Sequence, residues 1–355
     1  MKYKLILGLM SALLIFASCG SDNRQTLNIL NWGEYIDQEL VKKFEKEFNV
    51  RVIYEEVESS ETMYSKISAG AIKYDIAVPS EYTIELMIEE NLLSEIDTSI
   101  VTNTDNLDPK YYELTEFDKE GKYFVPYFTG NIGIMYNKDL VDSKDLDGWN
   151  VLWDEKYDNQ VYLYDSIRDT MSVGALYNGF SVNTKDKNEL DKIKTSLKKL
   201  NENARGYGTD DLKNLVSVGD GAMAVVYSGD YLVTYNDYIE SKSDMNVGFY
   251  VPDEGTNIWL DGLIIPKTSE NKELANEFIN FMLNEKNALK NAKYVGYTST
   301  NIRVNENLLN SGDKLYKTEA YMLPSDKFNK SEVYKNLGLE YNQMYSEIFT
   351  SIKND

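Results

Sequence analysis

The sequence contains no histidine, and its 355 residues include a single cysteine, Cys19. Without histidine the chain cannot build a Ser-His-Asp triad, a Cys-His pair or a His-ligated metal site. A lone cysteine excludes an intramolecular disulfide and a multi-thiolate metal site, so the fold must depend on packing. No Walker loop and no dinucleotide-binding GxGxxG follows a predicted strand. We therefore expect no metal and no cofactor, and among enzyme mechanisms only carboxylate chemistry of the glycosidase type stays open.

Basic residues are outnumbered, with 37 Lys and Arg against 58 Asp and Glu, which gives a formal net charge of -21. Such an acidic chain repels nucleic acid and attracts cations. Aromatic residues make up 12% of the chain and include 28 tyrosines, whereas disordered acidic chains have few aromatics. The composition predicts a folded protein with no nucleic-acid partner, and it agrees with a cationic ligand.

Long apolar runs are also absent, apart from one at the N-terminus. Lys2 and Lys4 precede the apolar residues 5–16, and small residues follow them. This run is shorter than the about 20 residues that a membrane-spanning helix needs. A charged start, a short apolar centre and small residues before a cleavage point are typical of a secretory signal peptide.

The apolar run ends in the sequence FASCG, which contains Cys19 and resembles a bacterial lipobox with Phe at its first position. In a lipobox the cysteine becomes the first mature residue and carries lipid. We predict a signal peptide over residues 1–18 and a lipid-anchored tether over residues 19–25. The protein would then be periplasmic or at the cell surface, attached to a membrane that it does not span. The alternative is a plain signal peptide in which Cys19 has no role.

Strands and helices alternate in the first part of the mature chain. We expect strands over residues 26–32, 50–57 and 74–79, with helices over 37–48 and 60–69 and a third helix from Ser80. This order predicts a parallel sheet covered by helices, in which ligands gather beyond the carboxyl ends of the strands. Residues 32–35, 58–60 and 80–82 follow these strand ends.

A second α/β region follows the extended segment 124–137. We expect strands over 161–164, 222–227, 247–251 and 258–266, and helices over 190–201, 272–283 and 334–352. Roughly 330 mature residues are too many for one simple core and suit two lobes. We predict an α/β fold with lobe 1 formed by 26–128 and 262–305 and lobe 2 by 129–261 and 306–355. Two extended crossings would make a hinge with a cleft between the lobes.

Several short motifs, in register over nearly the whole mature chain, resemble the spermidine/putrescine-binding subunits of bacterial ABC importers. They are NWGEY (31–35), ESSETMYSKI (58–67), YDIAVPSEY (74–82), PYFTGNIGIMYN (126–137), the pair Tyr227 and Asp230, WLDGLIIP (259–266) and VGYTSTN (295–301). The resemblance implies a type II periplasmic binding protein fold with two parallel or mixed sheets flanked by helices. It also implies a monomer that binds a polyamine, delivers it to a membrane permease and catalyses no reaction.

The resemblance further implies a ligand site at the positions that match the family. These positions are Trp32, Glu34, Tyr35, Ser80, Tyr82, Asp169, Thr209, Tyr227, Asp230, Trp259, Asp261 and Tyr297. Asp169 stands where the family usually has glutamate to hold an ammonium group, and Thr209 where it often has serine. Trp259 would cover the methylene chain, while Asp261 would pair with an amine.

Two positions differ between subgroups of the family. Ser166 stands where some spermidine-preferring members have aspartate, and Tyr227 where tryptophan is common. Asp230 matches the putrescine-preferring members. The choice between a diamine and a triamine therefore stays open, and a family glutamine from the C-terminal region has no secure counterpart between Tyr334 and Gln343.

These residue types suit a polyamine, which alternates ammonium groups with short methylene runs. Each buried ammonium needs its own carboxylate, because an unpaired buried charge costs several kcal/mol. Aromatic faces shield the methylenes and add cation–π attraction. Asp261, a lone carboxylate in the apolar run IWLDGLIIP, must face a partner. Other interpretations are a binder of another cationic solute, a surface hydrolase that uses two carboxylates, and an adhesion or scaffold lipoprotein.

Overall fold

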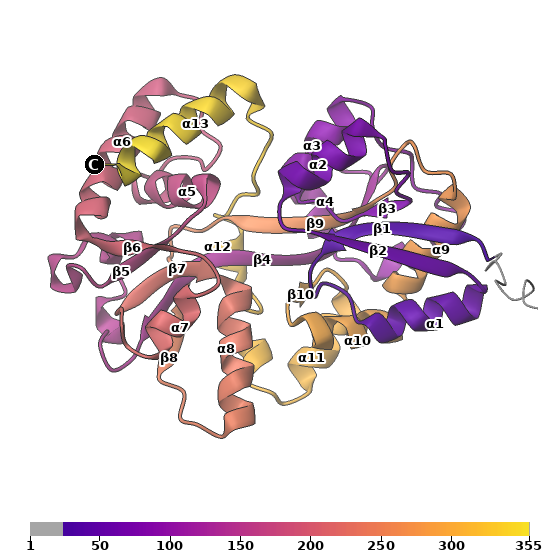
Figure 1. Cartoon of the computed structure of the whole chain (residues 1–355). Coiled ribbons are helices and arrows are strands. Elements are labelled where there is room, and N and C mark those ends of the chain that lie inside the picture. The colour runs from indigo at the N-terminus through magenta and orange to yellow at the C-terminus, as the bar shows by residue number, and fades with distance from the viewer. Residues whose placement is uncertain (1–23, 355) are drawn as a thin grey trace, which may run out of the picture.

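A computed structural model describes residues 24–354, which form two lobes joined by extended segments (Figure 1). Within these residues a 10-stranded sheet follows the order β2-β1-β3-β9-β4-β7-β5-β6, and β8 and β10 both pair with β4. Helices cover the faces of both halves of this sheet (Figure 1). The predicted α/β, two-lobed architecture is confirmed.

The first lobe begins with the predicted alternation of strands and helices. Its elements are β1 (Thr26–Trp32), α1 (Gln38–Phe48), β2 (Arg51–Val57), α2 (Ser60–Ala69), β3 (Ile76–Ala77) and α3 (Glu81–Glu89). Strand β1 is parallel to both β2 and β3. The Asp37 carboxylate accepts a hydrogen bond from the Glu39 N–H at the start of α1. Gly70 ends α2 at φ 61°, a left-handed conformation that favours glycine.

Later segments complete this lobe. They are α4 (Lys110–Leu114), α9 (Lys272–Leu283), α10 (Glu285–Val295), β10 (Thr298–Ser299) and α11 (Ile302–Asn310). Helix α10 packs against both α9 and α11, and α11 also contacts β10. The lobe boundaries by residue number stay a prediction.

Strand β4 (Phe124–Asn137) belongs to both lobes. Its residues 124–131 pair with β9 (Ile258–Ile264) in the first lobe, antiparallel. Its residues 132–137 pair with β7 (Met223–Tyr227) and β8 (Val247–Tyr250) in the second, also antiparallel. The lobes are therefore connected through continuous strand backbone, and the carboxylate-bearing β9 lies where they meet.

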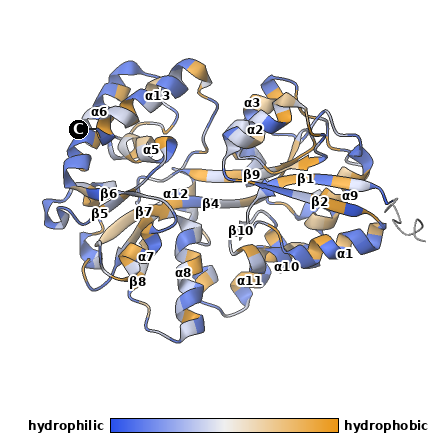
Figure 2. Cartoon of the chain, viewed as in Figure 1, coloured by the Kyte–Doolittle hydropathy of each residue, from blue (hydrophilic) through white to orange (hydrophobic). Residues whose placement is uncertain are grey.

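The second lobe has its own core. Its remaining elements are β5 (Val161–Tyr164), α5 (Ile167–Tyr177), α6 (Lys187–Asn203), β6 (Ala204–Gly208), α7 (Leu212–Ser217), α8 (Ser228–Ser241) and α13 (Gly338–Lys353). Residues such as Trp149, Ile193 and Leu197 are fully buried there. The helices carry both hydrophobic and hydrophilic residues, and β1 is rich in hydrophobic ones (Figure 2).

A third extended segment also links the lobes. Residues 331–336, which we call the strap, run from α12 (Ser325–Phe328) to α13. The carbonyl of Glu332 accepts from the Ile258 N–H at 2.9 Å, and the Glu332 N–H donates to the Thr256 carbonyl at 3.1 Å. The sequence predicts a helix from Tyr334, but α13 begins only at Gly338. That prediction is wrong at its start: the N–H groups of residues 334–336 bond in succession to side chains of other elements, and Gly338 has a left-handed φ of 76°.

The predicted signal peptide and Cys19 lie outside the described residues, as do most positions of the tether. Within residues 24–354, no helix combines the length and the apolar character that crossing a membrane requires.

Candidate binding site between the lobes

Asp261, on β9, is the centre of the first half of the site. Its side chain is almost fully buried, and its two oxygens accept hydrogen bonds from the Tyr35 and Ser80 hydroxyls, both at 2.7 Å. Ser80 stands at the N-cap position of α3 as predicted, yet its hydroxyl makes no cap bond because it is committed to Asp261. Burial raises the pKa of Asp261 to about 6, although the two hydroxyls act against this shift. The carboxylate is therefore well oriented but costly to ionise without a cation.

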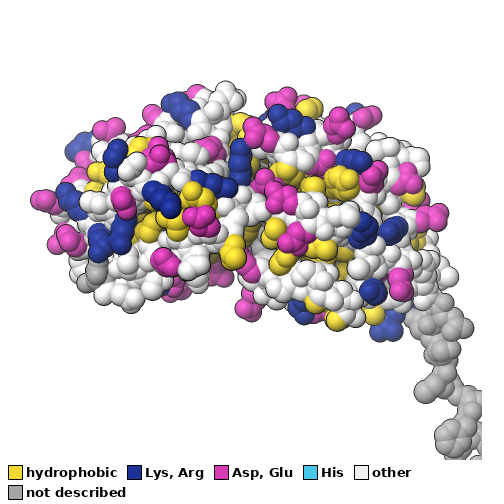
Figure 3. All heavy atoms as spheres, turned by 90° about the horizontal axis from the view of Figure 1, so that it is seen from above, with side chains coloured by type: hydrophobic (Ala, Val, Ile, Leu, Met, Phe, Trp, Pro, Cys, Tyr) yellow, Lys and Arg dark blue, Asp and Glu magenta, His cyan; other side chains and the backbone are white. Residues whose placement is uncertain are grey.

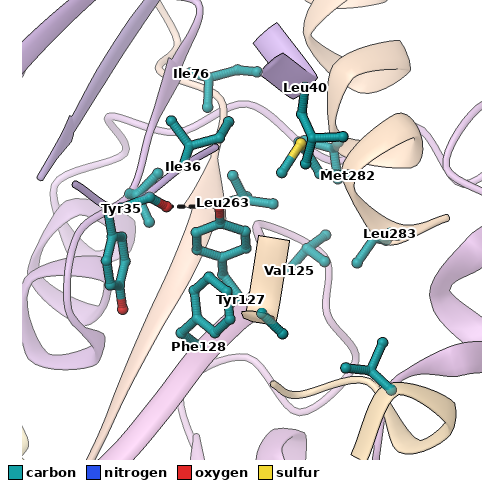
Figure 4. Close-up of a cluster of buried hydrophobic side chains, with 14 of the residues drawn as sticks. Tyr35, Ile36, Leu40, Ile76, Val125, Tyr127, Phe128, Leu263, Met282 and Leu283 are labelled. Atoms are coloured by element: carbon teal, nitrogen blue, oxygen red, sulfur yellow. Dashed lines mark hydrogen bonds between the residues drawn. The ribbon is translucent and has the colours of Figure 1, made fainter. Parts of the chain in front are cut away.

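Aromatic rings hold Tyr35 in place. Its ring lies 5.7 Å from Tyr127, 5.4 Å from Phe128 and 5.8 Å from Tyr297, all in edge-on geometry. Figure 4 shows the Tyr127 hydroxyl donating to the Tyr35 carbonyl, at 3.0 Å. Tyr297 also contacts the Trp259 ring edge-on, at 5.2 Å. These contacts fix the direction of the Tyr35 hydroxyl and form one aromatic wall.

Of the two predicted tryptophans, Trp259 borders this wall through its contact with Tyr297. Trp32 ends β1, and Trp259 lies on β9 two residues before Asp261; both side chains are partly buried. Neither buried indole N–H has a hydrogen-bond partner among the described residues. Indole N–H groups usually find a partner when buried, so a water or a ligand acceptor could complete them.

Asp169, in the first turn of α5, is the centre of the second half of the site. Its side chain is 1% exposed, and its oxygens accept from the Tyr227 hydroxyl at 2.6 Å and the Tyr334 hydroxyl at 2.8 Å. Ser166 caps α5 by accepting from the Asp169 N–H at 3.4 Å. Burial and then the adjacent carboxylate raise the pKa of Tyr227, so this phenol stays protonated and serves as a donor.

Tyr334 is a site residue that the sequence does not predict. It comes from the strap, and the Arg168 guanidinium stacks on its ring at 4.3 Å from the centroid. The hydrogen bonds of Arg168 go to the Lys335 carbonyl and to Asn183. The only sequence signal was the unplaced family glutamine from this part of the chain.

Asp230, in the first turn of α8, already has a cationic partner. The Lys213 ammonium lies 2.9 Å from it, and both side chains are largely buried. Burial raises the pKa of Asp230, whereas Lys213 lowers it. Burial raises the pKa of the Tyr164 phenol, and the negative charges of Asp230, Asp210 and Asp169 raise it further.

Backbone contact brings the two lobes together at this point. The start of α8 lies directly against Tyr297, and a Cβ atom on Gly229 would fall 1.7 Å from the Tyr297 Cε1. Only glycine permits this approach. Burial raises the pKa of the Tyr297 phenol, and so do the charges of Asp230 on one lobe and Asp261 at the crossing. The charges of Asp230 and Asp261 therefore act on the same ring.

Ten of the twelve predicted site residues fall into three groups; the other two are Trp32, at the end of β1, and Asp230, which is paired with Lys213. One contact network contains Tyr35, Ser80, Trp259, Asp261 and Tyr297, and a second contains Tyr82, Asp169 and Tyr227. Tyr82 reaches the second network through an edge-on contact with Tyr334, at 6.5 Å. Glu34, at φ 54°, and Thr209 are exposed, and their described contacts do not join either network.

Glu81 connects the hinge to the site and is the second residue that the sequence does not predict. It is fully buried, and its oxygens accept from the Leu260 N–H at 2.9 Å and the Tyr334 N–H at 3.1 Å. Burial raises its pKa to about 8. One side chain thus joins α3, β9 and the strap. An acid in a first helical turn is ordinarily exposed, and no local pattern distinguishes this one.

The outer surface agrees with the composition. Figure 3 shows acidic side chains spread over both lobes, with Lys and Arg side chains near the junction. One junction contact is the ion pair between Lys335 of the strap and Glu116, at 2.8 Å. Both partners are exposed, so this pair contributes little to stability.

Comparisons with known proteins place the chain in a family. Residues 39–320 match the family model described as bacterial extracellular solute-binding protein. The spermidine/putrescine-binding periplasmic protein of Salmonella typhimurium is 32% identical over 345 residues, covering 96% of this chain and 95% of the relative.

Solved structures agree. The spermidine/putrescine substrate-binding protein PotD of Streptococcus pneumoniae, in complex with calcium and HEPES, superposes with a TM-score of 0.83 at 35% identity, covering 93% of this chain and 99% of that one. A putative spermidine/putrescine ABC transporter protein of Listeria monocytogenes gives a TM-score of 0.81 at 38% identity, with the same coverage. The resemblance and the periplasmic binding protein fold predicted from the sequence are confirmed, and the relatives are solute-binding proteins rather than enzymes. The chain belongs to the bacterial extracellular solute-binding protein family.

Proposed function

We propose that this protein captures a polyamine, putrescine or spermidine, between its lobes and delivers it to the permease of an ABC importer. The supporting relatives carry spermidine/putrescine-binding names, and the site offers the chemistry that such a ligand needs. Aromatic rings flank the buried carboxylates, so that methylene segments would lie against apolar surface.

The observation that carries the proposal is the state of two buried carboxylates. Asp261 and Asp169 each accept from two hydroxyls, and none of the hydrogen bonds or ion pairs described for them comes from a cation. Hydroxyl groups orient a carboxylate but do not neutralise its charge. A ligand with two ammonium groups would supply the missing positive charges, one at each carboxylate. Because Asp261 lies at the crossing and Asp169 in the second lobe, such a ligand would favour the closed arrangement.

The test is isothermal titration of the purified protein with putrescine and spermidine at pH 7.5 and pH 5. We expect binding of at least one polyamine at pH 7.5. The pKa of Asp261 is raised to about 6, so at pH 5 this carboxyl is mostly protonated and must lose a proton to bind ammonium. Affinity should therefore be about tenfold weaker at pH 5. No heat with either polyamine at pH 7.5 would overturn the proposal.

The proposal includes a lipid anchor at Cys19 and a monomeric binding protein. The support for the anchor is the lipobox-like FASCG sequence. Metabolic labelling with a fatty acid should mark the wild-type protein and not Cys19→Ala; equal labelling of both would contradict the anchor.

A further inference from the structure

Lys213 and Asp230 form an ion pair at the candidate site. Lys213 lies on α7 and Asp230 in the first turn of α8, and the Nζ to Oδ1 distance is 2.9 Å. Their side chains are 20% and 11% exposed, so the pair is shielded from most of the screening that weakens surface ion pairs. The ammonium group of Lys213 is therefore already paired with Asp230, one of the acids that face the site.

The contacts around Asp230 place it between the two hydroxyl-held carboxylates. Its neighbour Gly229 packs its backbone against Tyr297, which contacts the Asp261 partner Tyr35 at 5.8 Å. On the other side, the Tyr164 ring lies 4.8 Å from Tyr227, which donates to Asp169. Burial raises the pKa of both Tyr297 and Tyr164, and the charges of Asp230 and Asp210 raise it further in each, so Asp230 lies close to both rings.

The three acids are therefore unequal as partners for a cationic ligand. Asp261 and Asp169 are bonded by neutral hydroxyls, whereas Asp230 is bonded to Lys213. The two ammonium groups of a diamine could each pair with a carboxylate that has no cationic partner, one with Asp261 and one with Asp169. A third ammonium group placed at Asp230 would meet a carboxylate that is already neutralised by the positive charge of Lys213. The positive charges of Lys213 and of a third ligand ammonium would repel each other, most strongly where water is excluded.

We propose that Lys213 is a specificity-determining residue, an internal ammonium that fills the Asp230 position and makes the site select diamines over triamines. This inference rests on the polyamine binding proposed above. Lys213 rejects the longer ligand in two ways, because it removes a partner for the third ammonium and adds a repulsive charge.

The test is isothermal titration of putrescine and spermidine into the wild-type protein and into Lys213→Met, which keeps the chain length and removes the charge. The wild type should prefer putrescine. In Lys213→Met the ratio of spermidine to putrescine affinity should rise by about tenfold or more. Lys213→Arg, which keeps the charge, should retain the wild-type preference, and so should Lys42→Met on the exposed face of α1.

The double variant Lys213→Met with Asp230→Asn separates this role from a structural one. It removes the internal cation together with its acid, so a third ammonium again lacks a partner and the gain in spermidine affinity should disappear. A wild type that prefers spermidine by tenfold overturns the inference, even if Lys213→Met fails to fold. An unchanged affinity ratio in folded Lys213→Met also overturns it. Failure of both polyamines to bind the wild type would instead overturn the proposed function.

Discussion

Asp261→Asn is expected to weaken putrescine binding by at least about 100-fold at pH 7.5. The amide keeps the shape of the side chain and can still contact Tyr35 and Ser80, but it carries no charge to pair with an ammonium group. A ligand ammonium would then be buried without an anion, which costs several kcal/mol. Isothermal titration measures the loss, and Asp191→Asn on the exposed face of α6 is the control for the loss of one acid. Binding within threefold of the wild type would contradict this role.

The same variant should not lose stability in the absence of ligand. The folded-state pKa of Asp261, about 6, lies above the ordinary value of 3.8. The stability contributed by this group is therefore fully present below pH 3.8 and is lost as pH rises through about 6. Asn never ionises, so the variant avoids a loss of up to about 3 kcal/mol in the free energy of unfolding. Its weaker hydrogen bonds to Tyr35 and Ser80 offset part of this gain.

Thermal melts at pH 5 and pH 7.5 measure this stability effect. The difference in melting temperature between Asp261→Asn and the wild type should be more positive at pH 7.5 than at pH 5. A variant that loses binding and also melts far below the wild type at pH 7.5 would point to a structural role for the carboxylate instead.

Asp169→Asn should have the second largest effect, a loss of about 30-fold to 1,000-fold in putrescine affinity. Asp169 is the anion of the second half of the site, and the phenols of Tyr227 and Tyr334 aim it without neutralising it. Tyr227→Phe removes one of these donors but leaves the charge, so it should weaken binding by less than Asp169→Asn does. The comparison by titration separates charge from orientation. Equal losses in the two variants, or an Asp169→Asn protein that binds normally, would contradict the assignment of Asp169 as an ammonium partner.

Much of the first lobe could be predicted from the sequence because its signals are local. Strand β1 and helices α2 and α9 have the predicted bounds, and Asp37 and Gly70 cap their helices through contacts within a few residues. The start of α13 could not be predicted in this way. The N–H groups of Tyr334, Lys335 and Asn336 all bond to side chains of distant elements, and these tertiary bonds keep the strap extended. Gly338, at φ 76°, is the one local feature that marks where α13 begins.

The candidate site shows the same limit. Asp261 could be singled out because a lone acid in an apolar strand needs a partner, and the partners are Tyr35 and Ser80. Tyr334, Glu81 and Lys213 carry no comparable local signal, since each one acquires its role from a residue far away in the chain. For the exposed Glu34 and Thr209, a role in binding stays a prediction.

The most direct test of the account is a crystal structure of the protein with putrescine bound. We expect one ammonium group within hydrogen-bond distance of Asp261 and the other at Asp169, with the methylene chain against Trp259 and Tyr297. Lys213 should still be paired with Asp230. A putrescine molecule bound elsewhere, or one held between the lobes without contact to either Asp261 or Asp169, would contradict the account.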